Sequence, residues 1–318
     1  MIIAIIICDI REAQMDAGDL KIFAAVARCG GMNRAAETLN TVQSNVTARI
    51  RVLEAEIGSP LFDRHSRGVT LTAAGRRLLP HAQSILRMLD EARRAASEDG
   101  KPRGTLTVGS LETTAALRLA PVLSRFVAAF PDVDLVLRTG TTCELVDEVL
   151  ARRLEGAFVC GPVVHAELEA ETVFEEELVL LAAPHVQSTR AALGGGDVRI
   201  VVLRAGCSYR QRLEGVLAKR GVQAPRLLEF GTLEAIFRCV SAGLGVTLLP
   251  RSLLDRVWEK AAVSVHELPK PEAHVQTLFV RRRDAFASSA LLAFLGHARG
   301  RNARGKARPS NQPAPEAA

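Results

Sequence analysis

The sequence lacks the cysteine pairs that mark a zinc site or a redox motif. No two of its six cysteines are spaced C-x-x-C, and none has a histidine at zinc-ligand spacing. The six are Cys8, Cys29, Cys143, Cys160, Cys207 and Cys239. We therefore expect reduced thiols, and neither a metal nor a cofactor.

Signals for export or membrane insertion are also missing. The apolar start, Met1–Cys8, is too short to cross a bilayer about 30 Å thick, and no basic region or cleavage site follows it. We expect a cytoplasmic protein that makes no membrane contact. Met15 is the expected natural start, which leaves residues 1–14 as a misassigned or disordered extension.

Spacings typical of an enzyme are absent as well. Neither Cys207 nor Ser208 is placed relative to the seven histidines in a way that predicts a nucleophile and its base. No phosphate-binding loop follows a first strand, and Gly194–Gly196 is typical of a connecting loop. The sequence favours binding over catalysis.

Composition sets the size and charge of the molecule. A chain of 318 residues, 48% of them hydrophobic, can build two or three domains with buried cores. Its net charge of +6 and pI near 9.3 suit nucleic acid. Residues 299–318, with five Lys and Arg against one Glu, predict a disordered basic tail.

A helix is predicted from Gln43 to Leu53. Its apolar residues recur at steps of four and three and so share one face: Val46, Ile50, Leu53 and Ile57. The opposite face is short and polar. Upstream, Asn33 is expected to cap a short helix over residues 34–39, and Asn40-Thr41 supplies the turn. Two helices joined in this way predict a helix-turn-helix.

A hairpin follows the two helices. Residues 60–62 (Pro-Leu-Phe) and 69–71 (Val-Thr-Leu) bracket a polar tip that contains Arg64 and Arg67. Such a hairpin is typical of a wing. Six Lys and Arg against three Asp and Glu between Thr41 and Arg77 give this segment a net charge of about +3, which attracts phosphate.

The polar helix face has the groups that DNA recognition requires. An amide can bond base edges in two directions, hydroxyls can bond bases or phosphates, and Arg suits guanine, phosphate or a narrow minor groove. The alternative is the solvated face of an ordinary helix. The candidate DNA-binding residues are Gln43, Ser44, Asn45, Thr47, Ala48, Arg51, Arg64 and Arg67.

These motifs resemble those of LysR-type transcriptional regulators. The strings RAAETL, QSNVTARIRVLE, LFDRHSRGVTLTAAG and the late AGLGVTLLP carry the resemblance, which runs from Asp19 to about Leu295. It implies that Gln43, Ser44, Thr47 and Ala48 approach bases or phosphates and that Arg67 reaches the minor groove. Many family members have Arg where this chain has Ala48.

A long helix is predicted over residues 72–97, capped by Thr72 and interrupted only by Pro80. Apolar residues form a heptad-like seam along it: Leu78, Ala82, Ile85, Leu89, Ala92 and Ala96. A seam of this kind favours a partner helix and hence a homodimer, as the resemblance also implies, with tetramers common. The alternative is an amphipathic helix that packs on its own domain.

The remaining chain predicts a two-lobed α/β domain. After a polar hinge at residues 98–104, short apolar strands alternate with helices over roughly 190 residues. The expected strands are residues 106–109, 133–137, 157–159, 179–182, 199–203, 246–249 and 277–280, and the expected helices include residues 117–130, 144–154, 209–220 and 233–243. The expected fold is an α+β multidomain protein: a winged helix-turn-helix, a long linker helix and a periplasmic-binding-protein-like effector domain. The expected segments are 15–72 for the DNA-binding domain, 73–103 for linker helix and hinge, 104–176 with 281–298 for lobe I, and 177–280 for lobe II.

Ligands in such folds bind beyond the carboxyl ends of strands, which here places a small-molecule effector between the lobes. Glu112 disfavours a multiply charged anion unless Arg204 or Arg210 balances it. Hydroxyls at these junctions can also cap helices for structural reasons alone. The candidate effector residues, some of them implied by the resemblance, are Ser110, Leu111, Thr113, Thr141, Thr142, Gly206, Cys207, Ser208, Gly231 and Thr232.

Two other functions stay open. Cys207 lies near Arg210 and Arg212, a setting that can lower a thiol pKa, and its segment resembles the reactive-cysteine region of peroxide-sensing LysR members. Val216 occupies the place of their second cysteine. A solute-binding protein is the other alternative, although it would lack an export signal and carry a DNA-binding head.

The favoured function is transcriptional regulation. A dimer or tetramer would hold recognition helices on a near-palindromic duplex, and effector binding would change their spacing, the bend of the DNA and contact with RNA polymerase. While bound to DNA, the protein would associate with the nucleoid.

Overall fold

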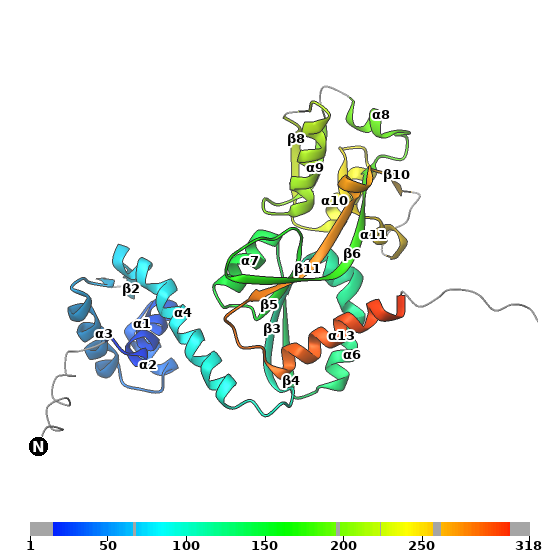
Figure 1. Ribbon diagram of the computed structural model, residues 1–318. Helices are drawn as coiled ribbons and strands as arrows, with labels where there is room; N and C mark the ends of the chain where they lie inside the picture. Colours follow the sequence, from blue (N-terminus) through cyan, green and yellow to red (C-terminus); the bar gives the residue numbers. More distant parts are fainter. Residues whose placement is uncertain (1–14, 66–67, 195–197, 223, 257–261, 306–318) are drawn as a thin grey trace, which may run out of the picture. The chain divides into compact units, whose positions relative to one another are not determined.

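The computed structural model describes residues 15–65, 68–194, 198–222, 224–256 and 262–305, with no side-chain description at 255–256 and 301–305. The chain divides into two compact units, residues 1–97 and 98–318 (Figure 1). In the described residues, no helix combines the length and the apolarity that a membrane crossing needs.

The N-terminal unit is the expected winged helix-turn-helix followed by a long helix. Its elements are α1 (Ala17–Cys29), α2 (Met32–Thr38), α3 (Gln43–Ile57), β1 (Phe62–His65), β2 (Gly68–Leu71) and α4 (Ala73–Ala96). The two strands pair antiparallel, with Phe62 opposite Leu71. The side chains of Phe23, Ile50 and Leu53 are fully buried in the shared core.

Capping residues set the starts of two of these helices. Asp16 accepts a hydrogen bond from the Asp19 N–H at 2.7 Å and begins α1. Thr72 accepts from the Gly75 N–H at 3.0 Å and begins α4, as expected. The expectation that Asn33 caps α2 is wrong: Gly31 occupies the cap position, because the helix starts two residues earlier than expected, at Met32, whose side chain is buried.

Two details at the ends of α2 and α3 follow from backbone geometry. Asn40 adopts a φ of 52° and makes the expected turn. Ile57, expected on the inward face of α3, is 38% exposed instead. The helix ends at Gly58, which has a φ of 71°, so Ile57 lies on its last turn beyond the core.

The long helix α4 touches its own unit only near its start. Gly75 and Ala82 are its buried residues, and Pro80 lies within it without ending it. Further along, three large apolar side chains are exposed: Ile85 at 40%, Met88 at 50% and Leu89 at 37%. The described residues of this unit therefore leave the second half of the seam without apolar cover.

A mixed sheet forms the main layer of the C-terminal unit. Its strands are β3 (Gly104–Ser110), β4 (Val133–Thr139), β5 (Gly156–Cys160), β6 (Leu168–Ala182), β9 (Thr247–Pro250), β10 (Ser264–His266) and β11 (His274–Arg282). The order is β10-β6-β11-β5-β3-β4, with β9 beside β6. β3 runs parallel to β4 and β5, whereas β11 runs antiparallel to β5 and β6. A separate parallel pair joins β7 (Arg199–Leu203) to β8 (Arg226–Phe230).

Helices cover these sheets. They are α5 (Glu112–Thr114), the π-helix η1 (Ala115–Leu119), α6 (Ala120–Ala129), α7 (Thr142–Leu150), α8 (Thr189–Leu193), α9 (Ser208–Lys219), α10 (Leu233–Ser241), α11 (Arg251–Arg256), α12 (Lys270–Ala273) and α13 (Ser289–Gly305). In lobe I, Phe126 of α6 and Phe294 of α13 pack edge to face over Phe158 of β5. Lobe II contains β7 to β10 with α8 to α12.

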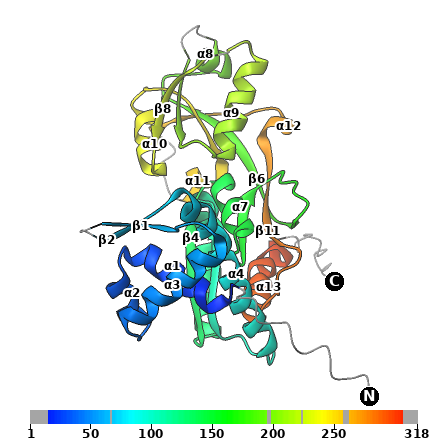
Figure 2. The same ribbon diagram turned by 90° about the vertical axis from the view of Figure 1, so that its left-hand side faces the viewer.

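The long strands β6 and β11 connect the two lobes (Figure 2). They run from one lobe of the two-lobed fold to the other, and their pairing differs from one expected lobe boundary. Residues Thr277–Val280 were expected in lobe II, yet they pair with Ala157–Cys160 of β5 in lobe I. Because β11 continues through the boundary without a break, its apolar pattern could not reveal where one lobe ends.

Other expectations need correction in detail. The strands β8 and β10 were not predicted, and α7 ends at Leu150 rather than at Leu154. The expected disordered tail began at residue 299, whereas α13 continues to Gly305. The rest of that tail, residues 306–318, lies outside the described residues, as does the expected extension 1–14.

We predict that Gly156→Ala destabilises the C-terminal unit by about 1–3 kcal/mol, because an added Cβ overpacks the core. It would lie 2.2 Å from Cζ of buried Phe279 and 3.0 Å from the Val280 carbonyl oxygen. Gly215→Ala is the matched control, since no atom lies within 4 Å of its Cβ position in α9. Urea unfolding followed by circular dichroism should show a loss only in the first variant; equal stability of the two would contradict this packing.

Candidate functional site

The exposed face of α3 contains all six of the expected DNA-binding residues on that helix. Gln43, Ser44, Asn45, Ala48 and Arg51 are exposed and Thr47 is half-buried. The opposite face, with Val46, Ile50 and Leu53, is fully buried. The unit thus presents a polar strip of amides, hydroxyls and one guanidinium on a rigid helix.

Hydrogen bonds between neighbouring side chains orient this strip. The Gln43 amide donates to the Thr47 hydroxyl at 3.0 Å, and the Asn45 amide donates to Thr41 at 3.1 Å. Arg51 has no hydrogen bond or ion pair to any described residue. Its guanidinium is therefore available to an external partner such as phosphate.

Arg49, also on α3, has a different role. Its guanidinium donates to Asp19 at 2.5 Å and to Asp16 at 2.9 Å, and so ties α3 to the start of α1. The Asp19 N–H and the Arg49 charge lower the pKa of the Asp16 carboxyl. Sequence reasoning did not single out this bridge, because its partners lie about 30 residues away in the chain.

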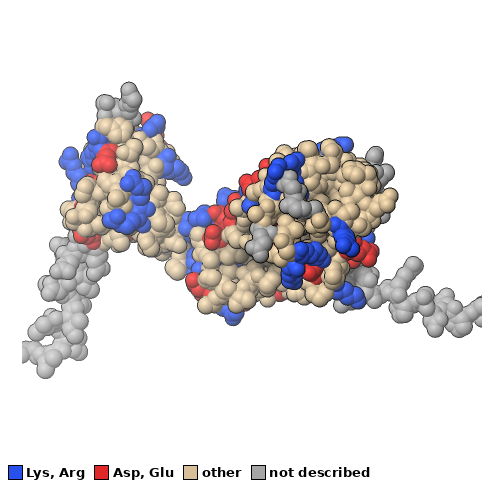
Figure 3. Space-filling view, turned by 90° about the horizontal axis from the view of Figure 1, so that it is seen from above, with Lys and Arg blue, Asp and Glu red and all other residues tan. Residues whose placement is uncertain are grey.

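Glu54 anchors the wing to α3. One carboxylate oxygen accepts from the backbone N–H groups of Leu61 at 2.8 Å and Phe62 at 3.2 Å. The other lies 3.5 Å from Nη2 of Arg64. Arg64, expected to contact DNA, is thus ion-paired within the unit, and the expected minor-groove residue Arg67 lies outside the described residues. On the face seen in Figure 3, basic side chains of this unit outnumber acidic ones.

A cavity of about 250 Å³ lies between the lobes of the C-terminal unit. Its walls come from the segments after β3 and β4, the end of β5, and the segments after β7 and β8. The lining residues are Leu111, Glu112, Thr113, Thr139, Gly140, Thr141, Cys160, Leu203, Arg204, Cys207, Ser208, Tyr209 and Gly231. The carboxyl ends of strands from both lobes thus meet at one site, as open α/β sheets predict.

Six of the ten candidate effector residues line this cavity and four do not. The six are Leu111, Thr113, Thr141, Cys207, Ser208 and Gly231. Behind the wall, the hydroxyl of Ser110 donates to the Leu111 carbonyl oxygen, and that of Thr142 accepts from the Cys160 N–H. Thr232 caps α10 by accepting from the Ala235 N–H.

Gly206 has a packing role. It has a φ of 90°, and a Cβ there would lie 2.9 Å from the hydroxyl oxygen of Thr141. The loop after β7 therefore approaches the start of α7 closely, and only glycine allows both this contact and this backbone conformation.

Tyr209 and Cys160 line the cavity but were not predicted. The phenol oxygen of Tyr209 in lobe II lies 3.4 Å from the hydroxyl oxygen of Thr113 in lobe I. Burial raises the pKa of Tyr209 far above its usual value, so the phenol stays protonated. Its position directly after Ser208 was the one sequence signal that could have identified it.

An ion pair crosses the cleft between Arg204 and Glu144, with Nη2 and Oε2 separated by 3.1 Å. Glu144 is also half of a capping box: it accepts from the Thr141 N–H at 2.8 Å, and its own N–H donates to the Thr141 hydroxyl. The Thr141 N–H, and then Arg204, lower the pKa of the Glu144 carboxyl. Thr141 is therefore committed to the cap of α7.

The two units combine a DNA-recognition fold with a ligand-binding fold, which defines a DNA-binding regulator with a sensor domain. The family of bacterial regulatory helix-turn-helix proteins of the lysR type matches residues 17–76, and the LysR substrate binding domain family matches residues 99–303. The chain belongs to the LysR family of transcriptional regulators.

Relatives of known sequence support this assignment. The chain is 45% identical over 281 residues to the uncharacterized HTH-type transcriptional regulator YusT of Bacillus subtilis, covering 88% of this chain and 94% of the relative. It is 42% identical over 280 residues to the HTH-type transcriptional regulator GltR of the same species, covering 88% and 95%. Its homologues are thus regulators rather than enzymes.

Solved structures of similar proteins have the same fold. Full-length CbnR, determined in complex with its target DNA, is 25% identical and has a TM-score of 0.62, with coverage of 90% of this chain and 99% of that chain. Full-length OxyR from Pseudomonas aeruginosa is 20% identical with a TM-score of 0.63, covering 90% and 95%. At 20% identity the second likeness shows the fold alone.

The cavity thiols do not have the electrostatic setting expected of a reactive cysteine. Burial raises the pKa of Cys207 above its usual value and that of Cys160 to about 11. Arg210 does lower the pKa of Cys207, as expected, through its backbone N–H and its charge, but burial outweighs this effect. The Arg210 guanidinium itself donates to Glu214 at 3.0 Å and Glu229 at 2.7 Å. The described residues contain no group of three or more His, Cys, Asp or Glu that could hold a metal ion.

We predict that iodoacetamide labels Cys143 well before Cys160 and Cys207. Cys143 is exposed, whereas a thiol with a pKa of about 11 is only ~0.1% thiolate at pH 8. Timed labelling and peptide mass spectrometry should show at least a roughly 50-fold difference in rate between Cys143 and Cys160. Labelling of Cys207 as fast as Cys143 would restore the redox-sensing alternative.

Proposed function

We propose that this regulator binds near-palindromic duplex DNA through α3 and the wing, and that a small molecule in the interlobe cavity controls this binding. The observation that carries the proposal is the oriented polar strip on α3 above a fully buried opposite face. Gln43, Thr47 and Arg51 would read or position the duplex. A DNA-bound protein of this kind works in the cytoplasm, at the nucleoid.

Some side chains of the strip would recognise the base sequence, and others would attract the phosphate backbone. Gln43 presents an amide that can bond adenine in the major groove, while Arg51 supplies an unpaired positive charge for phosphate. Ser44, Asn45 and Ala48 flank them on the same face. Arg64 would also attract phosphate, but more weakly, because Glu54 partly balances its charge.

We predict that replacing Gln43 and Arg51 with Ala has different effects. The Gln43 variant should lose roughly 5- to 150-fold of its preference for its operator over scrambled duplex, since a base contact is worth about 1–3 kcal/mol. The Arg51 variant should weaken both duplexes equally and reduce the salt slope by about 0.9. Fluorescence anisotropy titrations at about 50 to 200 mM salt measure both the operator preference and the salt slope.

The control is Lys21→Ala, which removes the same charge from an exposed position on α1. It should leave the operator preference unchanged and affect affinity least. Unaltered binding by both the Gln43 and the Arg51 variants would refute α3 as the recognition helix.

The exposed stripe on α4 supports a homodimer. Ile85 and Leu89 belong to the seam and Met88 flanks it, and all three are apolar and uncovered within their unit. Pairing with a second copy of α4 would bury them and place two copies of α3 on the two halves of a near-palindromic site. Tetramers would form by pairing of two dimers. Contact with RNA polymerase would depend on the spacing of the DNA-bound winged helix-turn-helix domains.

We predict that Ile85→Glu converts the dimer to a monomer, because a carboxylate in an apolar seam loses its hydration without a partner. Gln83→Glu, which adds the same charge on another side of α4, should leave the dimer intact. Sedimentation velocity at micromolar concentration distinguishes the two states. A dimer that survives in both variants would mean that other surfaces hold the copies together.

The cavity would bind the effector and couple it to DNA. Its wall comes from both lobes, so a ligand that contacts both stabilises one separation of the lobes over others. Linkage then requires that DNA binding and effector binding change each other's affinity by the same factor. A solute-binding protein, the remaining alternative, does not account for the polar strip on α3.

A further inference from the structure

We propose that the effector of this regulator carries a positively charged amine, which binds the carboxylate of Glu112. This inference rests on the proposed function of the interlobe cavity and adds the chemical class of its ligand. It follows from which charged side chains around the cavity are already paired and which one is not.

Glu112 is the carboxylate in the cavity wall. It is the first residue of α5, is half-buried, and has no hydrogen bond or ion pair to any described residue. The adjacent residues Leu111 and Thr113 also line the wall, and the Thr113 hydroxyl oxygen lies 3.4 Å from the Tyr209 phenol oxygen. A partly buried carboxylate without a partner favours a cationic ligand group over an anionic one.

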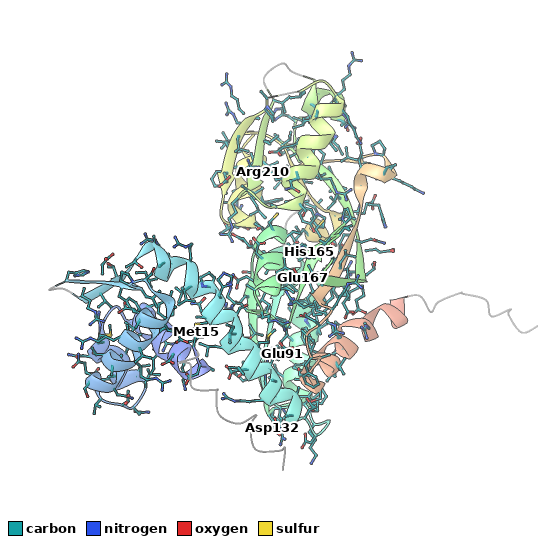
Figure 4. All side chains as sticks on the ribbon, turned by 60° about the vertical axis from the view of Figure 1, so that its left-hand side comes forward. Met15, Glu91, Asp132, His165, Glu167 and Arg210 are labelled. Atoms are coloured by element: carbon teal, nitrogen blue, oxygen red, sulfur yellow. The ribbon has the colours of Figure 1, made fainter. Side chains whose placement is uncertain are left out.

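The arginines that could balance Glu112 are occupied elsewhere. Arg204 is the guanidinium of the wall, and it binds Glu144 at 3.1 Å. Arg210 lies in lobe II (Figure 4) and donates to both Glu214 and Glu229. Its hydrogen bonds to Glu214 and Glu229 raise the pKa of Arg210 and outweigh burial, which lowers it.

The rest of the wall is neutral. Its other side-chain polar groups are hydroxyls and the thiols of Cys160 and Cys207, and burial keeps both thiols and the Tyr209 phenol protonated. The lining and Glu144 therefore sum to one negative charge, because Glu112 and Glu144 oppose Arg204 alone. A dianionic ligand would have to displace Glu144 from Arg204 and still face Glu112, whereas an ammonium group gains a partner without breaking a contact.

Glu112 also has a structural explanation that the experiment must separate. A carboxylate in the first turn of a helix is favourable because of the exposed N–H groups there. That role would make Glu112 matter for stability but not for the charge of the ligand. The readout must therefore compare ligands of different charge and the same shape.

The test uses the full-length protein and three probes that fit a cavity of about 250 Å³: cyclohexylmethylamine, cyclohexylmethanol and cyclohexanecarboxylate. Calorimetric titration should show the amine binding at least ~10-fold more tightly than the other two. Glu112→Gln should remove this advantage and leave alcohol binding within about twofold. Its thermal unfolding is measured in parallel, so that a folding defect is not mistaken for lost recognition.

Two control variants make the outcome decisive. Glu175→Gln removes the same charge from an exposed strand position outside the cavity wall and should not change amine binding. Gly231→Leu places a large side chain at a lining position where no atom lies within 4 Å of a Cβ, and should block all three probes.

The experiment distinguishes a failure of the charge assignment from a failure of the cavity as the ligand site. Tighter binding of the carboxylate, no amine binding, or an amine affinity that Glu112→Gln leaves unchanged would overturn the charge assignment. If Gly231→Leu blocks the probes in any of those cases, the cavity stands as the ligand site. Probe binding unaffected by Gly231→Leu would overturn the cavity itself.

Discussion

The sensing half of this protein depends on the pairing of two long strands, β6 and β11. β11 pairs with β6 over its whole length, from His274 to Arg282, with one bulge after Thr277. The first part of β6 and most of β11 belong to the lobe I sheet, and the end of β6 supports β9 and β10 of lobe II. Because both lobes share these strands, the junctions after β3, β4, β7 and β8 meet at one cavity.

Charged side chains divide into those that hold the scaffold and those left for partners. In the N-terminal unit, Arg49 ties α3 to α1 and Arg64 contacts Glu54, so Arg51 is the α3 arginine that remains available. In the cavity, Arg204 is paired with Glu144, whereas Glu112 has no ion pair to a residue that the structure describes. In both units, pairing within the fold thus decides which charges can serve recognition, and net charge alone would not distinguish them.

Local patterns were enough to predict α3, the wing and α4, since helical periodicity, turn residues and the Thr72 cap are encoded within short windows. The cap of α2 was missed because burial of Met32, rather than the capping strength of Asn33, decided where the helix begins. β8 was missed because its partner β7 lies more than 20 residues away and its own residues are largely exposed. Tyr209 enters the cavity only because lobe II packs against Thr113 of lobe I.

The sequence by itself determined the family, the fold class and the strip of α3 that faces solvent, because helical periodicity and motif spacing are properties of neighbouring residues. The tertiary structure alone decided which candidates line the cavity, which thiols are buried and which charges are already neutralised. Those outcomes depend on contacts between segments far apart in the chain, such as Arg204 with Glu144. Neither residue's own surroundings in the sequence specify that contact.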